Sequence, residues 1–294
     1  MNETGDRKLY SSVLNGNSWS GSMATVPGTT RDRPALAAYG GRLHCLHRGE
    51  DNDNMYHATF DGKGWTPFSM VVSDRIMTPD APSLTEFKGN LYSLHRGSDT
   101  HHLYWLTFNG TSWSGLSELP APTSPSWEGG IISLGTAKGP AIAVYQDTLY
   151  CVTRVRSSSY LFWTAFNGTT WAPWAWIGNN IMSAEAPALA AFNGKLYCVW
   201  RGDSDSAGIS WSSFDGTAWS AATQIPNCTT SESPALAVFD GKLHCIHRSD
   251  RSDELYHGTF NGSSWTSFTQ LPLRSWTTPA LAVFDNKLYC VHRG

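Results

Sequence analysis

Hydroxyl, carboxylate and guanidinium side chains recur together along this chain, in types and spacings that suit hydrogen bonding to a polar ligand. A hydroxyl stands four residues before a recurring proline at Thr30, Thr78, Thr136, Ser183, Thr230 and Ser275. Two residues before that proline stand Asp32, Asp80, Glu185 and Glu232 in four cases, with Lys138 and Thr277 in the others. An arginine ends a second repeated phrase at Arg48, Arg96, Arg154, Arg201, Arg248 and Arg293. Such groups match the paired donors and acceptors of sugar hydroxyls, and their charges would fix a sugar's orientation.

A structural interpretation of the same residues stays open. Ser, Thr, Asp and Glu side chains cap loops by bonding to nearby backbone groups, and an arginine beside a carboxylate can tie neighbouring units together. The arginine is present even where the acid is missing, as at Arg154 and Arg293. This favours a structural role for the arginine and leaves both roles open for the hydroxyl–acid pair.

Tryptophan supplies the aromatic surface that a sugar ring would need. Aromatic rings offer a flat apolar face and a polar edge, which suits the C–H faces of pyranoses. One set follows a recurring turn by a constant step, which favours packing between units: Trp19, Trp65, Trp113, Trp171, Trp219 and Trp265. Trp105, Trp163 and Trp211 share another position, and Trp276 lies in a loop; these four are the candidate sugar contacts.

A repeat of nearly fifty residues must position these side chains. The phrase at Pro34, PALAAY, returns in related form at Pro82, Pro140, Pro187, Pro234 and Pro279, at intervals of 48, 58, 47, 47 and 45 residues. A period of this length indicates a supersecondary unit that buries its apolar face only against its neighbours. The long interval indicates an insertion of about ten residues between Ser114 and Gly139.

Each unit is predicted to contain four short strands and no helix. In the unit from Pro234, apolar runs at 234–239, 243–248 and 255–260 are separated by Asp240-Gly241 and a polar loop, and Asn261-Gly262 precedes a fourth run. Asp-Gly and Asn-Gly between apolar runs are strong hairpin signals. We therefore expect an all-β fold, a six-bladed β-propeller of four-stranded antiparallel blades.

The two ends of the chain are expected to share one blade within a single domain, residues 1–294. The repeats start near 34, 82, 140, 187, 234 and 279, and the last supplies only two strands. The segment 1–33 carries the missing third and fourth strands, which would close the ring and remove open edges. Loops after the second and fourth strands vary and share one rim, so binding residues are expected there.

Composition excludes several classes of protein. The chain is 40% hydrophobic and 15% charged with a net charge of −3, which argues against nucleic-acid binding. No apolar run is long enough to span a bilayer, and the first eight residues lack the core of a secretory signal. The expectation is a soluble protein made in the cytoplasm, with release possible. Five cysteines occupy equivalent positions, too far apart for disulfides, and Cys228 is predicted to be the one reactive thiol, in a loop.

The repeat phrase PALAxF-x-G-K-LYC-x-HRG, followed by LY-x-x-x-F-N-G-x-x-W, resembles the repeats of bacterial and fungal β-propeller lectins, typified by the Photorhabdus and Psathyrella lectins. The resemblance covers essentially the whole chain, although those lectins are mostly seven-bladed. It implies shallow pockets between blades that bind fucose, GlcNAc or related glycan ends, without catalysis, cofactor or metal. Glycans or glycoconjugates on cell surfaces would be the partners, and an oligomer is possible.

Two other functions stay open as alternatives. A protein-interaction scaffold would use one asymmetric patch, for which the 114–139 insertion is the candidate. A sialidase-like glycosidase needs carboxylates that face each other across one bond. Because the acids here are spread one per blade, we expect them to lie apart and the protein not to be an enzyme.

Overall fold

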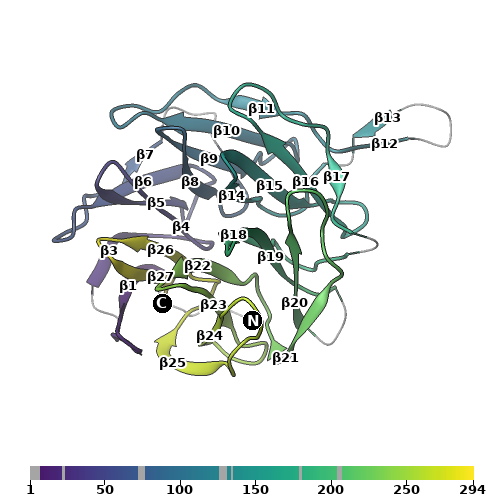
Figure 1. Ribbon diagram of the computed structural model, residues 1–294. Helices are drawn as coiled ribbons and strands as arrows, with labels where there is room; N and C mark the ends of the chain where they lie inside the picture. The colour runs from purple at the N-terminus through teal and green to yellow at the C-terminus, as the bar shows by residue number, and fades with distance from the viewer. Residues whose placement is uncertain are drawn as a thin grey trace.

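The computed structural model describes residues 7–21, 24–71, 77–125, 131–133, 135–178, 181–203 and 207–294. Within these ranges the fold is all-β and contains no helix. Six sheets stand around one axis, each with its first strand innermost (Figure 1). The six-bladed propeller expected from the repeat is confirmed.

The blades are numbered from the first complete repeat. Blade 1 contains β4 (Ala35–Tyr39), β5 (Arg42–Arg48), β6 (Met55–Phe60) and β7 (Ser69–Met70); blade 2 contains β8 (Ser83–Phe87), β9 (Asn90–Arg96), β10 (Leu103–Phe108) and β11 (Ser117–Leu119). Blade 3 contains β14 (Ala141–Tyr145), β15 (Thr148–Arg154), β16 (Leu161–Phe166) and β17 (Ala175–Trp176); blade 4 contains β18 (Ala188–Phe192), β19 (Lys195–Arg201), β20 (Gly208–Phe214) and β21 (Thr223–Thr229). Blade 5 contains β22 (Ala235–Phe239), β23 (Lys242–Arg248), β24 (Glu254–Phe260) and β25 (Thr269–Arg274).

Blade 6 is built from both ends of the chain. β26 (Ala280–Phe284) and β27 (Lys287–Arg293) supply its inner half, and β1 (Lys8–Asn15) pairs antiparallel with β27, with Tyr10 opposite His292. β2 (Ser18–Trp19) and β3 (Ala24–Thr29) both pair with β1. Pairing of the two ends closes the ring as expected, and it removes a break at which two blades would otherwise expose their edges.

Two kinds of turn give the repeat its hairpins. At the turn between the first two strands of blade 4, Asn193 and Gly194 have φ of 45° and 70°. Two consecutive positive φ values are what a two-residue hairpin of the type I′ kind requires. At the outer turn of blade 5, Asn261 Oδ1 instead accepts the backbone N–H groups of Ser263 and Ser264, both at 2.9 Å. The Asn-Gly and Asp-Gly signals therefore mark real turns, formed in two different ways.

Burial in the core explains the repeated cysteines. Cys45, Cys151, Cys198, Cys245 and Cys290 are completely buried in the second strands and form no disulfide. Burial also applies to Cys228, which is 3% exposed in β21 rather than in a loop. Desolvation raises the pKa of Cys228 to about 12. The prediction that Cys228 is the reactive thiol is therefore wrong, because a buried protonated thiol is a poor nucleophile.

Two matching chains of hydrogen bonds join neighbouring blades through histidines. Trp113 Nε1 donates to His57 Nδ1 at 3.4 Å, and His57 Nε2 lies 2.9 Å from His44 Nδ1. His44 Nε2 ends the chain 3.1 Å from the Tyr39 carbonyl oxygen. A carbonyl can only accept, so each ring must carry its proton on Nε2 and offer Nδ1 as acceptor. The same arrangement recurs between blades 6 and 5, where the bonds run from Trp19 through His257 and His244 to the Phe239 carbonyl oxygen.

The long interval in the repeat corresponds to an additional pair of strands. β12 (Thr123–Pro125) and β13 (Ile131–Ser133) pair with each other and with no blade in the described part of the chain. Figure 1 shows this hairpin extending away from the ring. The insertion is thus the one marked departure from sixfold symmetry among the described strands.

Candidate functional site

The hydroxyls of the repeated loops are buried at one end of the propeller axis. Thr30, Thr78, Ser183, Thr230 and Ser275 are all 0% exposed. Each donates to the backbone carbonyl two residues later, as Thr30 Oγ1 does to Asp32 at 2.8 Å and Ser183 Oγ does to Glu185 at 2.6 Å. Thr136, 1% exposed, instead donates to the His101 carbonyl at 3.0 Å. In this conformation these hydroxyls shape the loops and offer no surface to a ligand.

The six arginines mostly tie each blade to the next. Arg201 Nε donates to the Thr230 carbonyl at 2.8 Å, and Arg154 Nε donates to the Ser183 carbonyl at 2.6 Å. The same bond to the following loop recurs for Arg48, Arg248 and Arg293, with the carbonyls of Pro79, Ser275 and Arg31 at 3.1 Å each. Arg96 differs, since it pairs with Asp80 and lies 2.7 Å from His101 Nδ1. These contacts support the structural interpretation of the repeated arginine.

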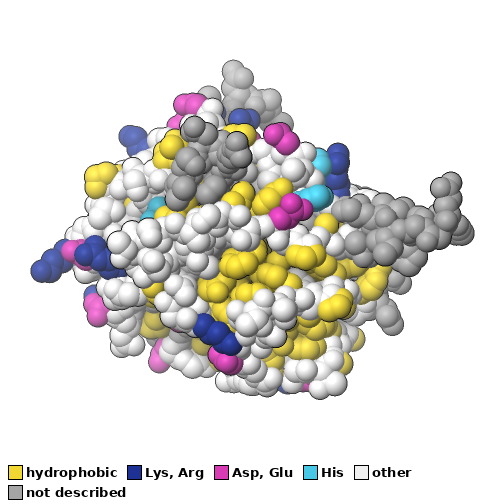
Figure 2. All heavy atoms as spheres, turned by 90° about the horizontal axis from the view of Figure 1, so that it is seen from above, with side chains coloured by type: hydrophobic (Ala, Val, Ile, Leu, Met, Phe, Trp, Pro, Cys, Tyr) yellow, Lys and Arg dark blue, Asp and Glu magenta, His cyan; other side chains and the backbone are white. Residues whose placement is uncertain are grey.

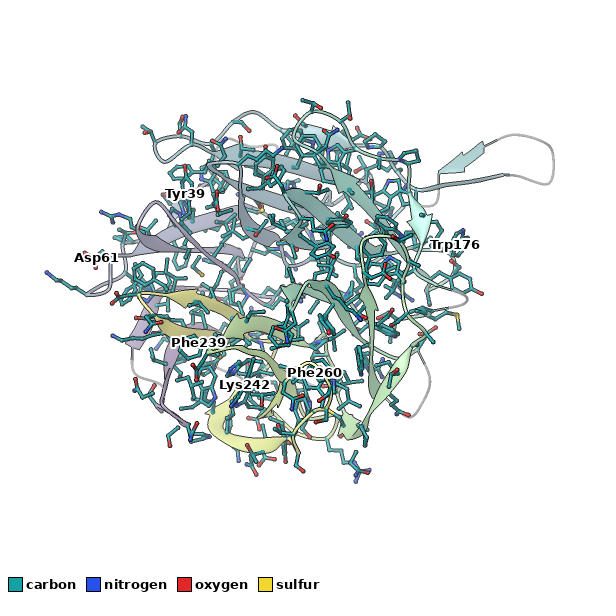
Figure 3. The ribbon with its side chains drawn as sticks, in the orientation of Figure 1. Tyr39, Asp61, Trp176, Phe239, Lys242 and Phe260 are labelled. Carbon is teal, nitrogen blue, oxygen red and sulfur yellow. The ribbon has the colours of Figure 1, made fainter. Side chains whose placement is uncertain are left out.

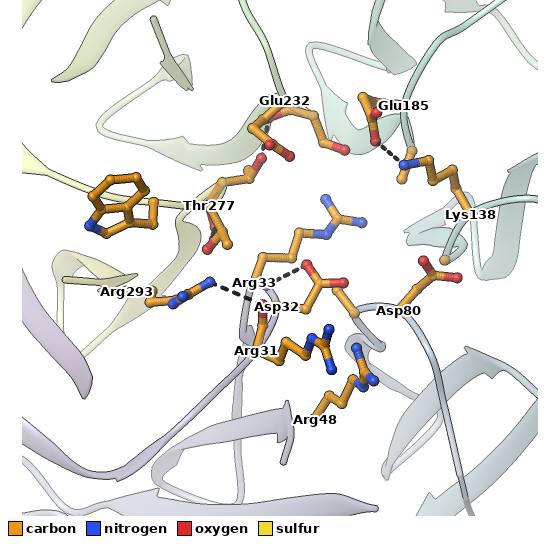
Figure 4. A pocket seen from close by; sticks show the side chains of 16 residues that line it. Arg31, Asp32, Arg33, Arg48, Asp80, Lys138, Glu185, Glu232, Thr277 and Arg293 are labelled. Atoms are coloured by element: carbon orange, nitrogen blue, oxygen red, sulfur yellow. Dashed lines mark hydrogen bonds and ion pairs between the residues drawn. The ribbon is translucent and has the colours of Figure 1, made fainter. Parts of the chain in front are cut away.

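The carboxylates of four loops line one pocket on the axis, shown in Figure 4. Its volume is about 360 Å³, and Asp32, Asp80, Glu185 and Glu232 reach it from four different blades. The expectation that these acids lie apart is therefore wrong. A propeller brings the start of every first strand to the same axis, so residues one repeat apart meet there.

Positive charges from the same loops balance the acids of the axial pocket. Lys138 Nζ lies 2.7 Å from Glu185 Oε2, and Arg33 points into the middle of the ring in Figure 4. Trp276, 37% exposed, lines this pocket on the axis.

Burial and crowding change the acidity of this pocket. Desolvation, with the nearby charges of Glu185 and Asp32, raises the pKa of Glu232 to about 7. Desolvation also raises the pKa of Asp32, although Arg33 opposes this shift. The pKa of Arg33 is lowered by burial. Glu232 is consequently a carboxyl that exchanges its proton near neutral pH.

Trp105, Trp163 and Trp211 lie at three successive blade interfaces. Their rings pack on the second-strand tyrosines Tyr92, Tyr150 and Tyr197, with ring centroids 5.8 Å apart in every case. Each also faces a phenylalanine of the following blade, as Trp163 faces Phe214 at 5.1 Å. These tryptophans are half-buried, so they are partly available at the surface.

The largest of the grooves described between blades is aromatic. It lies between blades 3 and 4, has a volume of about 610 Å³, and is lined by Trp163, Trp176, Ile181, Phe214 and Trp219 together with the hydroxyl-bearing Thr217 and Ser220. We call it the Trp176 groove. Trp176 is 50% exposed at the outer edge of the ring (Figure 3), and Phe162 and Tyr160 hold its ring at centroid distances of 4.2 and 5.1 Å.

Sequence reasoning included Trp163 among the candidates but missed Trp176 and Trp219. The missing signal was exposure: Trp219 belongs to the repeated packing set, and Trp176 stands at a fourth-strand position where other blades carry Met70, Glu118, Gln224 and Gln270. Figure 2 shows hydrophobic side chains gathered on the outer surface of the ring as well.

Other grooves between blades are smaller. One of about 350 Å³ between blades 1 and 2 is lined by Tyr39, Arg42, His44 and Phe108. Another of about 270 Å³ lies between blades 6 and 1 and includes His47, Tyr56 and Phe68. Aromatic rings beside polar groups thus recur at several interfaces, with a different composition in each.

Solved structures with the same fold include sugar-binding proteins. The Aleuria aurantia lectin, in complex with Fucα1-6GlcNAc, matches with a TM-score of 0.66 at 13% identity, covering 90% of this chain and 89% of that one. AofleA from Arthrobotrys oligospora matches with a TM-score of 0.64 at 13% identity, covering 96% and 81%. An α-L-arabinanase of Penicillium chrysogenum, complexed with arabinobiose, also reaches 0.64 at 13% identity, covering 89% and 92%.

At these identities the likeness establishes the fold, which the Aleuria lectin shares as a six-bladed propeller. No family model and no curated protein matches this sequence. The specific relation to the Photorhabdus and Psathyrella lectins therefore stays a prediction.

The described residues offer neither a metal site nor a membrane-spanning helix. They contain no group of three or more His, Cys, Asp or Glu side chains placed to hold a metal ion. They also contain no helix of the length and apolarity needed to cross a membrane.

Proposed function

We propose that this propeller binds carbohydrate, without chemical conversion, in the aromatic grooves between its blades. The observation that carries the proposal is the Trp176 groove, where an indole held by two other rings leaves half of its surface open beside hydroxyl groups. Apolar sugar faces pack on such rings, while the ring edges and neighbouring hydroxyls take the polar groups. The sugar-binding propellers that share the fold add support.

The proposed sites differ from those expected from the sequence. The buried hydroxyls and the blade-tying arginines would act indirectly, by holding the blades that form the groove walls. Trp105, Trp163 and Trp211 would contribute directly through their exposed parts. Fucose and GlcNAc ends stay the proposed sugars, and several grooves per chain would make binding multivalent.

A glycan array followed by calorimetry with the best sugar tests this function. Trp176→Ala is expected to remove one groove and lower the measured stoichiometry, while the melting temperature changes little because the side chain is half exposed. Trp65→Ala, at a repeated packing position, is the control that should lower stability instead. No binding to any glycan on the array would refute the proposal.

The axial pocket supports a second candidate function, glycoside hydrolysis. Glu232 has a pKa of about 7, which suits a general acid, and other carboxylates share its pocket. Hydrolysis of aryl glycosides that is lost in Glu232→Gln, but kept in Trp176→Ala, would favour this function. Absence of turnover together with glycan binding would favour the lectin.

A further inference from the structure

The axial pocket contains one arginine at a repeat position that is small in every other blade. The residue directly before the repeated proline is Arg33 in blade 1. Its equivalents in the other blades are Ala81, Gly139, Ala186, Ser233 and Thr278. All of them line the pocket, and the small residues leave space on the axis into which Arg33 points (Figure 4). The ring therefore has one central cation, and its pocket can hold one ligand per chain.

The guanidinium of Arg33 makes no hydrogen bond or ion pair with the described residues. Its interactions with the carboxylates of Asp32, Asp80, Glu185 and Glu232 act through space alone. The central channel of the propeller, which Arg33 also lines, has mainly apolar walls that supply no charged partner. A guanidinium carries five N–H donors, and leaving them unmatched in a partly desolvated place is costly. This arginine is therefore available to a ligand that brings acceptors.

Glu232 supplies an anion that is likewise unpaired. Among the acids of the pocket, Asp80 pairs with Arg96, and Glu185 pairs with Lys138. The acid of blade 1 accepts the backbone N–H of the central arginine at 2.6 Å. The Glu232 carboxyl makes no hydrogen bond or ion pair within the described part of the chain. The pocket thus presents one unpaired cation and one unpaired anion to the same space.

These two groups select a ligand that carries both charges. An inorganic anion on Arg33 would face the surrounding carboxylates, and a metal cation would face Arg33 itself. A neutral sugar would leave both charges uncompensated, and charge-assisted hydrogen bonds are roughly twice as strong as neutral ones. A zwitterion satisfies Arg33 and Glu232 together.

Size and lining narrow the zwitterion to a single α-amino acid. The pocket volume of about 360 Å³ lies near the lower end of the range of roughly 300–1,000 Å³ that takes small molecules. Trp276, 37% exposed, offers an indole against which a ligand side chain can pack. A guanidinium also matches a carboxylate through two parallel hydrogen bonds, which fixes the orientation of the bound molecule.

We propose that the axial pocket binds one free α-amino acid, whose carboxylate accepts hydrogen bonds from Arg33 while its ammonium donates to Glu232. The ligand's side chain lies against Trp276. This site is distinct from the grooves between blades and does not depend on carbohydrate binding, so the protein takes two classes of ligand at two places.

Calorimetry with glycine, L-leucine and L-phenylalanine tests the proposal on the full chain. At least one of them is expected to bind with one site per chain. The amide of the tightest binder lacks the carboxylate, and its N-acetyl derivative lacks the ammonium. Each derivative should bind at least about tenfold more weakly, the order of one lost bond between charged groups. No binding by any of the three amino acids, or equal binding of the parent and either derivative, would overturn the proposal.

Variants of the two charged residues locate the site. Arg33→Met and Glu232→Gln should each weaken amino-acid binding at least about tenfold. Arg33→Lys keeps the charge, loses the paired donors and should fall between Arg33→Met and the wild type, which preserves the test if Arg33→Met does not fold. Arg251→Met is the matched control, because this arginine side chain is 90% exposed on a loop of blade 5, and it should leave the affinity unchanged.

Two results would assign the axial pocket differently. Unchanged amino-acid affinity in both Arg33→Met and Glu232→Gln would overturn the proposal. Loss of glycan binding in folded Arg33→Met would make the pocket a sugar site and overturn it as well. Trp176→Ala, which should leave amino-acid binding intact, tests the proposed carbohydrate binding separately.

Discussion

Equivalent positions of the repeat carry different side chains in different blades, and these side chains play different roles. The second and third strands of blade 1 carry the His44–His57 pair, where blade 3 carries Tyr150 and Trp163 in the same places. Burial, with the neighbouring His44, lowers the pKa of His57 to about 4, and burial likewise lowers the pKa of His47 to about 4. The neutral forms of these rings are therefore part of the folded state.

Acid is expected to destabilise the protein through these histidines. Their pKa values are depressed relative to about 6.5 in the unfolded chain, so their stabilising contribution is present above pH 6.5 and is lost as pH falls toward 4. Melting temperatures measured from pH 7.5 to pH 4 should fall over this window. The double variant His44→Tyr, His57→Trp, copied from blade 3, should show a shallower fall, and an identical profile would contradict this explanation.

Two acids of the axial pocket should respond in opposite ways to loss of charge. Asp80→Asn breaks a largely buried ion pair with Arg96 and should cost about 1.5–3 kcal/mol of unfolding free energy.

Glu232 has a raised pKa, so its ionisation costs stability as pH rises from about 4.5 through 7. Glu232→Gln should match the wild type at pH 5 and exceed its stability at pH 8. Chemical denaturation at both pH values measures this, and a stability loss at pH 8 would contradict it.

The fold could be predicted from local signals in the strands and turns, whereas the site depends on which distant segments the ring brings together. The period, the Asn-Gly turns and the apolar runs are local signals, and each reports directly on one hairpin. Which side chains share a pocket depends on the ring geometry, which places Asp32, Asp80 and Glu232 together although they are far apart in sequence. The exposed ring of Trp176 arises from a departure from the repeat, so a prediction from repeated positions overlooks it.

At the scale of the blade, the repeated arginine is expected to act on stability and not on binding. Arg201→Met removes the bond from blade 4 to the Thr230 carbonyl in blade 5, and the side chain of methionine keeps most of the packing. A bond from a charged donor contributes about 1.5–3 kcal/mol, and the unfolding free energy should fall by that order. Calorimetry should find the Trp176 groove, at a different interface, with unchanged affinity. Weaker sugar binding at unchanged stability would instead make Arg201 a ligand contact.

The whole molecule presents its grooves around a closed, rigid ring. Blade 6 holds both chain ends through the β1–β27 pairing, so the angles between blades are set by closure as well as by local packing. Grooves of different composition between blades 1 and 2, 3 and 4, and 6 and 1 face outward from this ring. A rigid spacing of weak sites is the arrangement that benefits most from several ligands fixed on one surface.

Binding to glycan-coated surfaces should therefore exceed binding to free sugar by about 10²–10⁴ in apparent affinity, because each further site binds at a high effective concentration. Surface plasmon resonance at rising glycan density, compared with calorimetry on the free sugar, measures the difference. Trp176→Ala should reduce the enhancement on dense surfaces far more than it changes affinity at the remaining sites, since it removes one member of a linked set. One tight site per chain, with equal affinity for free and surface-bound sugar, would show that the ring does not act as a multivalent binder.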